Sequence, residues 1–272
     1  MIKKLKLNVP KILPIKSLRE NHYPNNEPRT KRCHNQMSVD EFRKRFNDNQ
    51  INILDVSGIF EIHLIVDPDD QVKLFSFSVQ EDVLRDKDYL NLKTTCALSF
   101  YGSKPNQPML TFWMSNTDSK GVIRKTLQLV DKMQSQGLDV KRLKVEAMAK
   151  NVPGIGPNSP NYFEFHFKVD TKSKQQWDVL DNLCLPSGAH LFFNPYSKLP
   201  HRMIPVVTLR VYDVNFESAD NQCKELMQKI ANHGFTVIDG KVQKELSIID
   251  TDVFYDQGWL FKEDPRVFIT CH

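Results

Sequence analysis

The sequences FEIH at Phe60–His63 and FEFH at Phe163–His166 are nearly the same, and each precedes a second segment that also recurs. The later segments read PMLTFWM at Pro108–Met114 and PVVTLRV at Pro205–Val211, with the same spacing from proline to threonine. Recurrence of this kind is typical of two copies of one supersecondary unit. The sequence therefore predicts an internal duplication.

The second copy gives the clearer order of elements. Residues 162–169 alternate between apolar and polar side chains as a strand does, and helical spacing appears at 174–183 and 218–233. Two strands lie between these helices and one follows them, which gives the order β-α-β-β-α-β of a ferredoxin-like unit. The first copy gives the same order, and the alternation at 73–79 reads as an extra strand.

We therefore expect an α+β fold of two tandem ferredoxin-like units, which could join into a pseudo-symmetric barrel. The expected domains are a basic, proline-containing arm at 1–37, a first unit with a preceding helix at 38–152, a linker at 153–161, and a second unit with a C-terminal tail at 162–272. Gly137 and Gly234 are the expected helix stops of the two copies.

Composition points to a soluble globular protein. Of the 272 residues, 40% are hydrophobic and 26% are charged, which is ordinary for that class. No apolar run reaches the roughly 18 residues that a membrane span needs. The five cysteines form no CxxC pair, which favours reduced thiols and an intracellular, cytoplasmic location.

The net charge of +4 is unevenly distributed along the chain. Residues 1–35 carry nine Lys or Arg and two Glu, so this arm has a net charge of +7 and the remainder a net charge of −3. A basic arm can contact nucleic acid or an assembly partner, and it can equally be a solvated tail. Both interpretations stay open at this point, and the sequence does not indicate an oligomeric state.

Strand alternation places the repeated polar residues on one face. In the second copy Glu164, His166 and Lys168 lie opposite the apolar face, and Thr208 and Arg210 occupy the same face of the later strand. In the first copy the corresponding residues are Glu61, His63 and Thr111. The two sets would converge if the units paired their open faces or edges.

Carboxylates and imidazoles in one cavity can bind a divalent metal or divide acid and base roles between them. We therefore expect a pocket for a phosphorylated or otherwise anionic small molecule or nucleotide, with metal-assisted phosphoester chemistry as one activity. The expected catalytic residues are Glu61, His63, Glu164 and His166, the expected metal ligands are His63 and His166, and the expected ligand-binding residues are Thr111, Lys168, Thr208 and Arg210.

Two alternatives accompany this hypothesis. The Glu-x-His pairs can be an ordinary solvated sheet face, and cross-strand polar pairs then contribute roughly 0.2–1 kcal/mol each. The protein can also be a non-enzymatic binding or structural module that acts through its arm. Whether it is an enzyme, and which metal it would use, stays open.

Two families have a related bimodular plan. The segment from Glu164 to Lys168 resembles the alternating Glu and Lys of the triphosphate tunnel enzymes, although His166 replaces the second Glu. One histidine per copy resembles the two-histidine phosphoesterases, but Ile65 and Lys168 stand where that family has a hydroxyl residue. The resemblance is therefore one of architecture, and architecture does not fix function.

Overall fold

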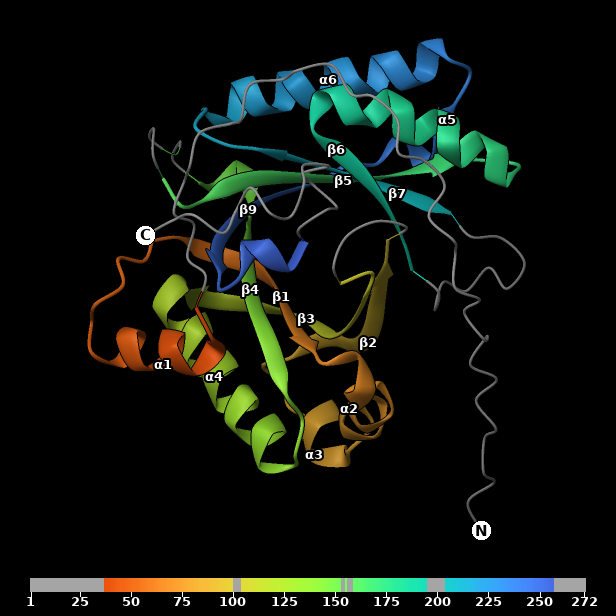
Figure 1. Cartoon of the computed structure of the whole chain (residues 1–272). Helices are drawn as coiled ribbons and strands as arrows, with labels where there is room; N and C mark the ends of the chain where they lie inside the picture. Colours follow the sequence, from red (N-terminus) through yellow and green to blue (C-terminus); the bar gives the residue numbers. More distant parts are fainter. Residues whose placement is uncertain (1–36, 100–103, 153–154, 156–158, 195–203, 257–272) are drawn as a thin grey trace, which may run out of the picture. The chain divides into compact units, whose positions relative to one another are not determined.

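The computed structural model describes residues 37–99, 104–152, 155, 159–194 and 204–256 (Figure 1). The chain divides into two compact units, residues 1–31 and 32–272, and every described residue belongs to the second unit. The basic arm expected at 1–37 lies outside the described residues except for Met37, and so does most of the linker at 153–161.

Eight of the described strands form a closed antiparallel barrel. The order around the barrel is β7-β6-β2-β3-β1-β4-β9-β5, and pairing of β5 with β7 closes it. The strands are β1 Ser57–Val66, β2 Leu90–Leu98, β3 Asn106–Asp118, β4 Val140–Met148, β5 Tyr162–Asp170, β6 Ala189–Phe193, β7 Pro205–Val211 and β9 Gln243–Asp250. The short strand β8, Thr236–Val237, pairs only with the end of β5.

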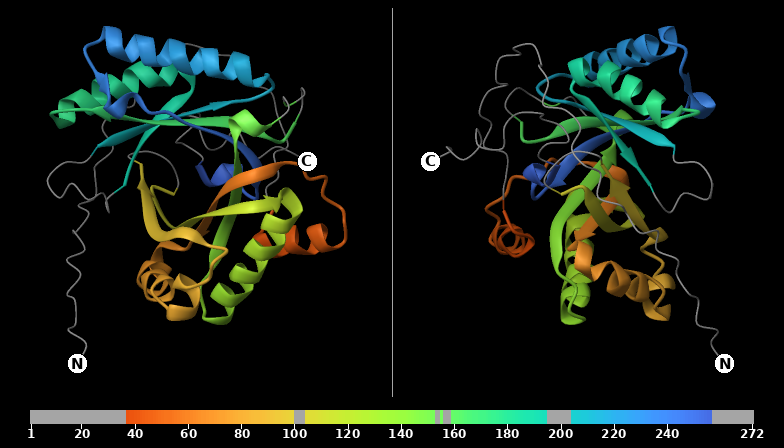
Figure 2. Two further views of the ribbon diagram at one scale, coloured as in Figure 1. Left: turned by 180° about the vertical axis from the view of Figure 1, so that it is seen from behind. Right: turned by 45° about the vertical axis from the view of Figure 1, so that its right-hand side comes forward.

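Helices cover the outside of this sheet. In Figures 1 and 2, α5 and α6 lie together over β5, β6 and β7, while α1 to α4 lie over the strands of the first half. The helices are α1 Val39–Asn47, α2 Gln71–Ser78, α3 Glu81–Leu84, α4 Ser119–Ser135, α5 Lys174–Cys184 and α6 Phe216–Asn232. Short 3-10 turns occupy Pro68–Asp70, Ala149–Asn151, Leu185–Ser187, Ile238–Gly240 and Val253–Asp256. Within the described part of the chain, no helix has the length and apolarity to cross a membrane.

The α+β content is as expected, but the prediction of two tandem ferredoxin-like units is wrong. Strands from the two halves of the chain share one sheet, because β4 pairs with β9 along 144–148 and β2 meets β6 at Leu98 and Phe193. A single apolar cluster also combines side chains from both halves. The alternation of side chains predicts strands and their faces, but it does not predict which strands pair along their edges. The strand pairing between the two halves determines this fold.

The extra strand predicted at 73–79 is also wrong, because these residues form the helix α2. Its buried residues Leu74, Phe77 and Ser78 have the spacing of one helical face. The alternation that suggested a strand is that of Phe75, Phe77 and Val79 with Ser76 and Ser78, and over so short a segment both periods fit.

Helix ends agree with the sequence more closely. The expected helix before the first unit is present as α1, and the side chain of Ser38 accepts a hydrogen bond from the backbone N–H of Glu41 and caps it. Gly137 and Gly234 have positive φ angles of 76° and 81° just after α4 and α6, which confirms both helix stops. The helix α6 begins at Phe216, slightly before the helical spacing expected at 218–233, and Asn215 supplies its capping oxygen.

The two faces of the repeated strands are divided as predicted. Phe60, Ile62 and Leu64 of β1 are fully buried in the apolar cluster beneath the helices, as are Phe163 and Phe165 of β5. In the barrel β1 pairs with β3, and β5 pairs with β7. The alternate side chains of these strands therefore face the inside of the barrel, where the polar residues gather.

Candidate functional site

Two histidine–threonine pairs lie inside the barrel in matching arrangements. His63 Nδ1 lies 2.9 Å from Thr111 Oγ1, and His166 Nδ1 lies 2.8 Å from Thr208 Oγ1. In both cases the histidine and the threonine stand directly opposite each other on neighbouring strands. The histidine side chains retain 18% and 19% exposure, so they form the accessible part of an otherwise buried cluster.

The other nitrogen of each ring faces two carboxylates. His63 Nε2 lies 3.2 Å from Glu146 Oε2 and 3.8 Å from Glu61 Oε1. His166 Nε2 lies 3.6 Å from Glu164 Oε1 and 3.9 Å from Glu245 Oε2. All four glutamates are almost completely buried, so each imidazole separates buried negative groups from solvent.

These glutamates form two like-charge pairs across the strands. Glu61 stands directly opposite Glu146 on β4, and Glu164 stands directly opposite Glu245 on β9. Like charges in this position destabilise a sheet, and burial increases the cost. The Gln243 amide nitrogen donates to Glu61 and, at 2.9 Å, to Glu245 Oε1, and so links the two pairs. Nearby positive charge or protonation of a carboxylate is needed to offset the repulsion within these glutamate pairs.

Lys144 and Arg210 supply part of that positive charge. Lys144 Nζ lies 2.8 Å from Glu146 Oε1 and also bonds Glu164, while Arg210 Nε lies 3.2 Å from Glu164 Oε2. Burial alone would raise the pKa of Glu164, but Arg210 and Lys144 outweigh it and hold that pKa well below its usual range. Glu164 is therefore ionised and neutralised by its two cationic neighbours.

A second ionic network fills the adjoining part of the interior. Arg142 binds Asp250 through two hydrogen bonds of 2.7 and 2.6 Å, and it also contacts Asp256 at 2.9 Å. Asp256 further accepts hydrogen bonds from Arg210 at 2.7 Å and from Gln107 at 2.8 Å. Arg210 is thus engaged by two carboxylates, which opposes its predicted role as an anion-binding residue.

The described interior carries more acidic than basic groups. It contains six carboxylic side chains and three permanently charged cations. The acids are Glu61, Glu146, Glu164, Glu245, Asp250 and Asp256, and the cations are Arg142, Lys144 and Arg210. Burial raises the pKa of Glu245 well above its ordinary value, and the nearby Glu146 and Glu61 raise it further. The surroundings of Glu245 therefore favour its protonated form unless a further cation is present.

Some of these carboxylate oxygens have no hydrogen-bond partner among the described residues. Neither oxygen of Glu146 has one, although Lys144 and His63 lie at ion-pair distance, and Oε2 of Glu245 has none. One ligand atom each from Glu146, His166 and Glu245 lies within 4.8 Å of the others. Two carboxylates and one imidazole are suitable donors for a divalent metal.

The structure places the sequence-predicted residues unevenly. Glu61, His63, Glu164 and His166 belong to the interior cluster, and Thr111, Thr208 and Arg210 contact its members; Lys168 is exposed near the end of β5. His166 belongs to the group of possible metal ligands formed with Glu146 and Glu245, whereas His63 lies beside that group.

Sequence reasoning missed Lys144, Glu146, Gln243 and Glu245. A signal was available on β4, where Leu143, Val145 and Ala147 are apolar and the alternate positions are charged. Applying the same face assignment to β4 and β9 as to β1 and β5 would have found these residues.

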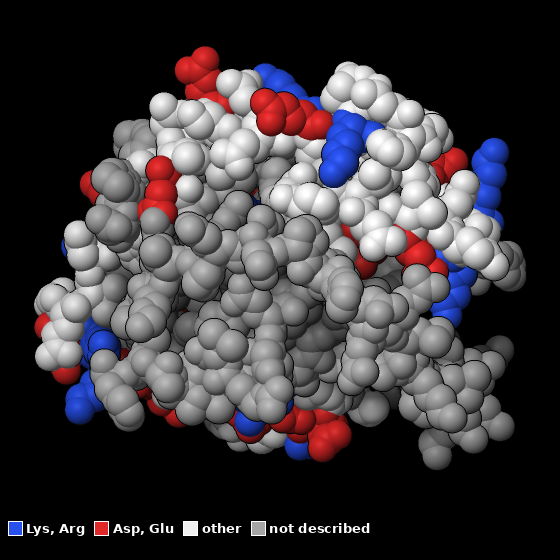
Figure 3. Space-filling model, turned by 45° about the horizontal axis from the view of Figure 1, so that its top comes forward, with Lys and Arg blue, Asp and Glu red and all other residues white. Residues whose placement is uncertain are grey.

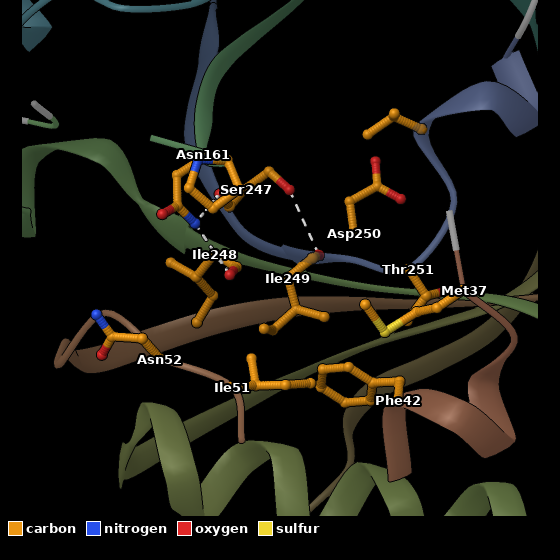
Figure 4. A pocket seen from close by; sticks show the side chains of 12 residues that line it. Met37, Phe42, Ile51, Asn52, Asn161, Ser247, Ile248, Ile249, Asp250 and Thr251 are labelled. Atoms are coloured by element: carbon orange, nitrogen blue, oxygen red, sulfur yellow. Dashed lines mark hydrogen bonds between the residues drawn. The ribbon is translucent and has the colours of Figure 1, made fainter. Parts of the chain in front are cut away.

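A small pocket lies elsewhere, between α1 and β9 (Figure 4). Met37, Phe42, Ile51 and Ile249 point toward one another there, and the Asn161 amide donates to backbone carbonyls of β9. Its volume of about 30 Å³ is room for a water molecule and not for an organic ligand. None of the predicted site residues lines it.

Surface charge gives no comparable site on the face shown in Figure 3. The described Lys and Arg side chains alternate with Asp and Glu there, and neither sign gathers into one patch. The predicted contact of the arm with nucleic acid or an assembly partner stays a prediction, because residues 1–36 lie outside the described part of the chain.

Comparison with known proteins adds little. No family model and no curated protein matches the chain. Among solved structures, a chlorite dismutase-like protein is 10% identical, with a TM-score of 0.24, over 73% of this chain and 98% of that one. An anthrone oxidase-like protein is 12% identical, with a TM-score of 0.22, over 71% of this chain and 93% of that one. Likenesses this weak carry no argument about activity.

Proposed function

We propose that the barrel binds a divalent cation and, through it, a phosphorylated or otherwise anionic small molecule at the end where His63 and His166 are accessible. The observation that carries this proposal is the surplus of buried carboxylates beside two partly exposed imidazoles. A merely structural interior would pair its charges or use apolar residues, since buried ions are costly to maintain.

Because the interior has more acidic than basic groups, the cation has to bind before the anion. A phosphate group that entered alone would approach Glu61, Glu146 and Glu164 without a free cation to meet it, because Lys144 and Arg210 are already paired. Electrostatic interactions are strong in such a poorly solvated interior. A divalent cation reverses the local charge and provides a point of attachment for an anion.

Metal-assisted hydrolysis of a phosphoester is the chemistry that this arrangement supports best. A bound divalent ion makes water more acidic and polarises a phosphoryl oxygen. In the reaction the water oxygen forms a bond to phosphorus, the ester P–O bond breaks, and the proton from water is passed to the leaving oxygen. His63, held by Thr111 and adjacent to Glu61, is placed to carry that proton.

A thermal-shift experiment tests the proposal. The full chain, treated with a chelator, is heated with Zn²⁺, Mn²⁺ or Mg²⁺, with and without inorganic phosphate or p-nitrophenyl phosphate. We expect the metal to raise the Tm, and the phosphate probes to raise it further only when metal is present.

The His63→Ala/His166→Ala variant should lose both shifts, and His233→Ala, an exposed histidine at the end of α6, should retain them. Phosphate shifts that are the same with and without metal, or that survive in the double variant, would contradict the proposed function.

A further inference from the structure

We propose that Glu146, His166 and Glu245 are the protein ligands of one first-row transition-metal ion, of the class of Zn²⁺, Mn²⁺ or Fe²⁺. This inference rests on the proposed function and names its cation and the residues that hold it. Two of the three residues were not apparent from the sequence motifs, and they come from β4 and β9, which join the two halves of the barrel.

The distances between the donor atoms suit a shared ion. Metal bonds to histidine nitrogen and carboxylate oxygen are about 2.0–2.2 Å long, so neighbouring ligand atoms around one ion lie roughly 3–4 Å apart. The three donor atoms lie within 4.8 Å of one another, and His166 Nε2 lies 3.9 Å from Glu245 Oε2. Small side-chain movements therefore bring all three into coordination distance.

An unpartnered carboxylate oxygen points independently to a ligand. Glu245 is 1% exposed, yet its Oε2 has no hydrogen-bond partner among the described residues, and the nearest ion-pair atom, His166 Nε2, lies 3.9 Å away. Leaving a buried charged group unsatisfied costs more than leaving a neutral one unsatisfied. An ion held between Glu245, His166 and Glu146 would satisfy this oxygen and would add to the ion pairs that Glu146 makes with Lys144 and His63.

Each of the three residues is also held in place by an outer partner. The His166 ring contacts Thr208 through Nδ1 at 2.8 Å, which leaves Nε2 toward the carboxylates. Glu245 accepts a 2.9 Å hydrogen bond from Gln243. Glu146 lies between Lys144 and His63. Metal ligands are commonly oriented by such partners, whose loss typically lowers metal affinity about 10- to 100-fold.

The donor types select the class of metal. Ca²⁺ and Mg²⁺ prefer oxygen ligands alone, whereas an imidazole with carboxylates suits Zn²⁺, Mn²⁺ and Fe²⁺. Three protein ligands leave at least one coordination position open, as in catalytic metal sites. Since His166 is the most exposed of the three ligands, water or a phosphate oxygen would reach that position from its side.

Metal titration of the full chain tests the inference without any phosphorylated ligand. Chelator-treated protein is titrated with Co²⁺ as a spectroscopic probe and with Zn²⁺ and Mg²⁺ by calorimetry. We expect one equivalent of Co²⁺ to bind and develop visible absorption bands, Zn²⁺ to displace it, and Mg²⁺ to bind far more weakly.

Three variants locate the ion, and two serve as matched controls. His166→Ala and Glu245→Gln should lower Co²⁺ affinity at least 100-fold, and Gln243→Ala about 10- to 100-fold. His233→Ala and Glu225→Gln change exposed residues of the same types and should leave affinity and the spectrum unchanged. Circular dichroism verifies that each variant is folded, and Gln243→Ala remains informative if a ligand variant does not fold.

The outcomes separate this inference from the proposed function. No Co²⁺ binding by the wild-type protein, or equal binding by the wild type, His166→Ala and Glu245→Gln, would overturn the inference. If Co²⁺ binds as expected but phosphate probes never bind, the metal site stands and the proposed function fails. If Co²⁺ binds as expected but phosphate probes bind equally well without metal, the metal site again stands and the proposed function fails.

Discussion

His63 Nε2 lies 3.2 Å from Glu146 Oε2 across the paired strands β1 and β4. The two residues are diagonal neighbours, because His63 stands opposite Lys144 and Glu146 stands opposite Glu61. The second half repeats this geometry, with His166 opposite Gln243 and diagonal to Glu245. Each histidine therefore faces a buried pair of glutamates that the register of the sheet forces together.

Hydrogen-bonded register is set by the whole barrel, so Glu61 stays opposite Glu146, and Glu164 stays opposite Glu245, whatever rotamers their side chains adopt. Their repulsion can be relieved by a proton, by a cationic side chain or by a bound cation. Lys144 and Arg210 relieve it at Glu164, and Lys144 and His63 relieve it at Glu146. At Glu245 burial and the nearby carboxylates raise the pKa, and its Oε2 without a hydrogen-bond partner is where a bound cation gains most.

Removing Glu164 should destabilise the barrel strongly. Glu164→Ala leaves the buried Lys144 and Arg210 without their shared carboxylate, and breaking buried ion pairs in this way costs about 3–5 kcal/mol. Urea unfolding followed by circular dichroism measures the loss. Glu225→Gln on the exposed face of α6 is the control and should change the unfolding free energy by less than about 0.5 kcal/mol. A loss below about 1 kcal/mol for Glu164→Ala would show that the ion pairs contribute little.

His190 should make the unfolding free energy depend on pH. Burial lowers its pKa to about 3, with Arg210 adding to the effect, so His190 is neutral in the folded protein. The unfolded chain takes up a proton near pH 6.5, so this contribution is complete above that pH and is lost as pH falls toward 3. One proton gives a slope of at most about 1.4 kcal/mol per pH unit.

Comparison with His190→Gln isolates this effect. Glu245, whose pKa is raised, gives a slope of the opposite sign at pH values above its ordinary pKa, so the wild-type profile alone is not diagnostic. The difference between the two unfolding free energies, measured in urea at intervals from pH 7.5 to 4.5, should shrink as pH falls. A difference that stays constant over this range would mean that His190 is not held neutral.

The sequence predicted the polar and apolar faces of β1, β3, β5 and β7 because each strand alternates side chains with a period of two. That is why His63, His166, Thr111 and Thr208 emerged as one face. The structure adds the register, in which His63 stands opposite Thr111 and His166 stands opposite Thr208.

Closure of the barrel could not be predicted in the same way. The pairing of β4 with β9 joins strand edges from the two halves of the chain, and no local pattern encodes which edges meet. The faces of Glu146 and Glu245 could have been assigned from alternation, but their proximity to His166 exists only across that junction and could not. Alternation also placed Lys168 on this face, but it assigns a face and not a depth, and Lys168 lies at the exposed end of its strand.

His63 should affect the chemical step more than the metal. It lies outside the group formed by Glu146, His166 and Glu245, but it is within reach of Glu61 and is held by Thr111. His63→Ala should lower phosphoester hydrolysis at saturating metal by about 10²- to 10⁴-fold, the usual contribution of a proton-transfer group. Steady-state kinetics with p-nitrophenyl phosphate and Co²⁺ titration of the same variant check this. If Co²⁺ binding disappeared together with activity, His63 would be a metal ligand instead.

The contact between β2 and β6 should be the place where the barrel opens most readily. In the described residues a single pair, Leu98 and Phe193, joins these strands, whereas β1 pairs with β3 at eight positions. Segments with few backbone hydrogen bonds open at lower free energy and exchange their amide hydrogens faster. Hydrogen exchange read by mass spectrometry should therefore show faster exchange in β6 than in β1, although both strands contain fully buried side chains. Equal protection of the two strands would mean that the barrel opens only by global unfolding, and the β2–β6 contact would then be as strong as the rest of the sheet.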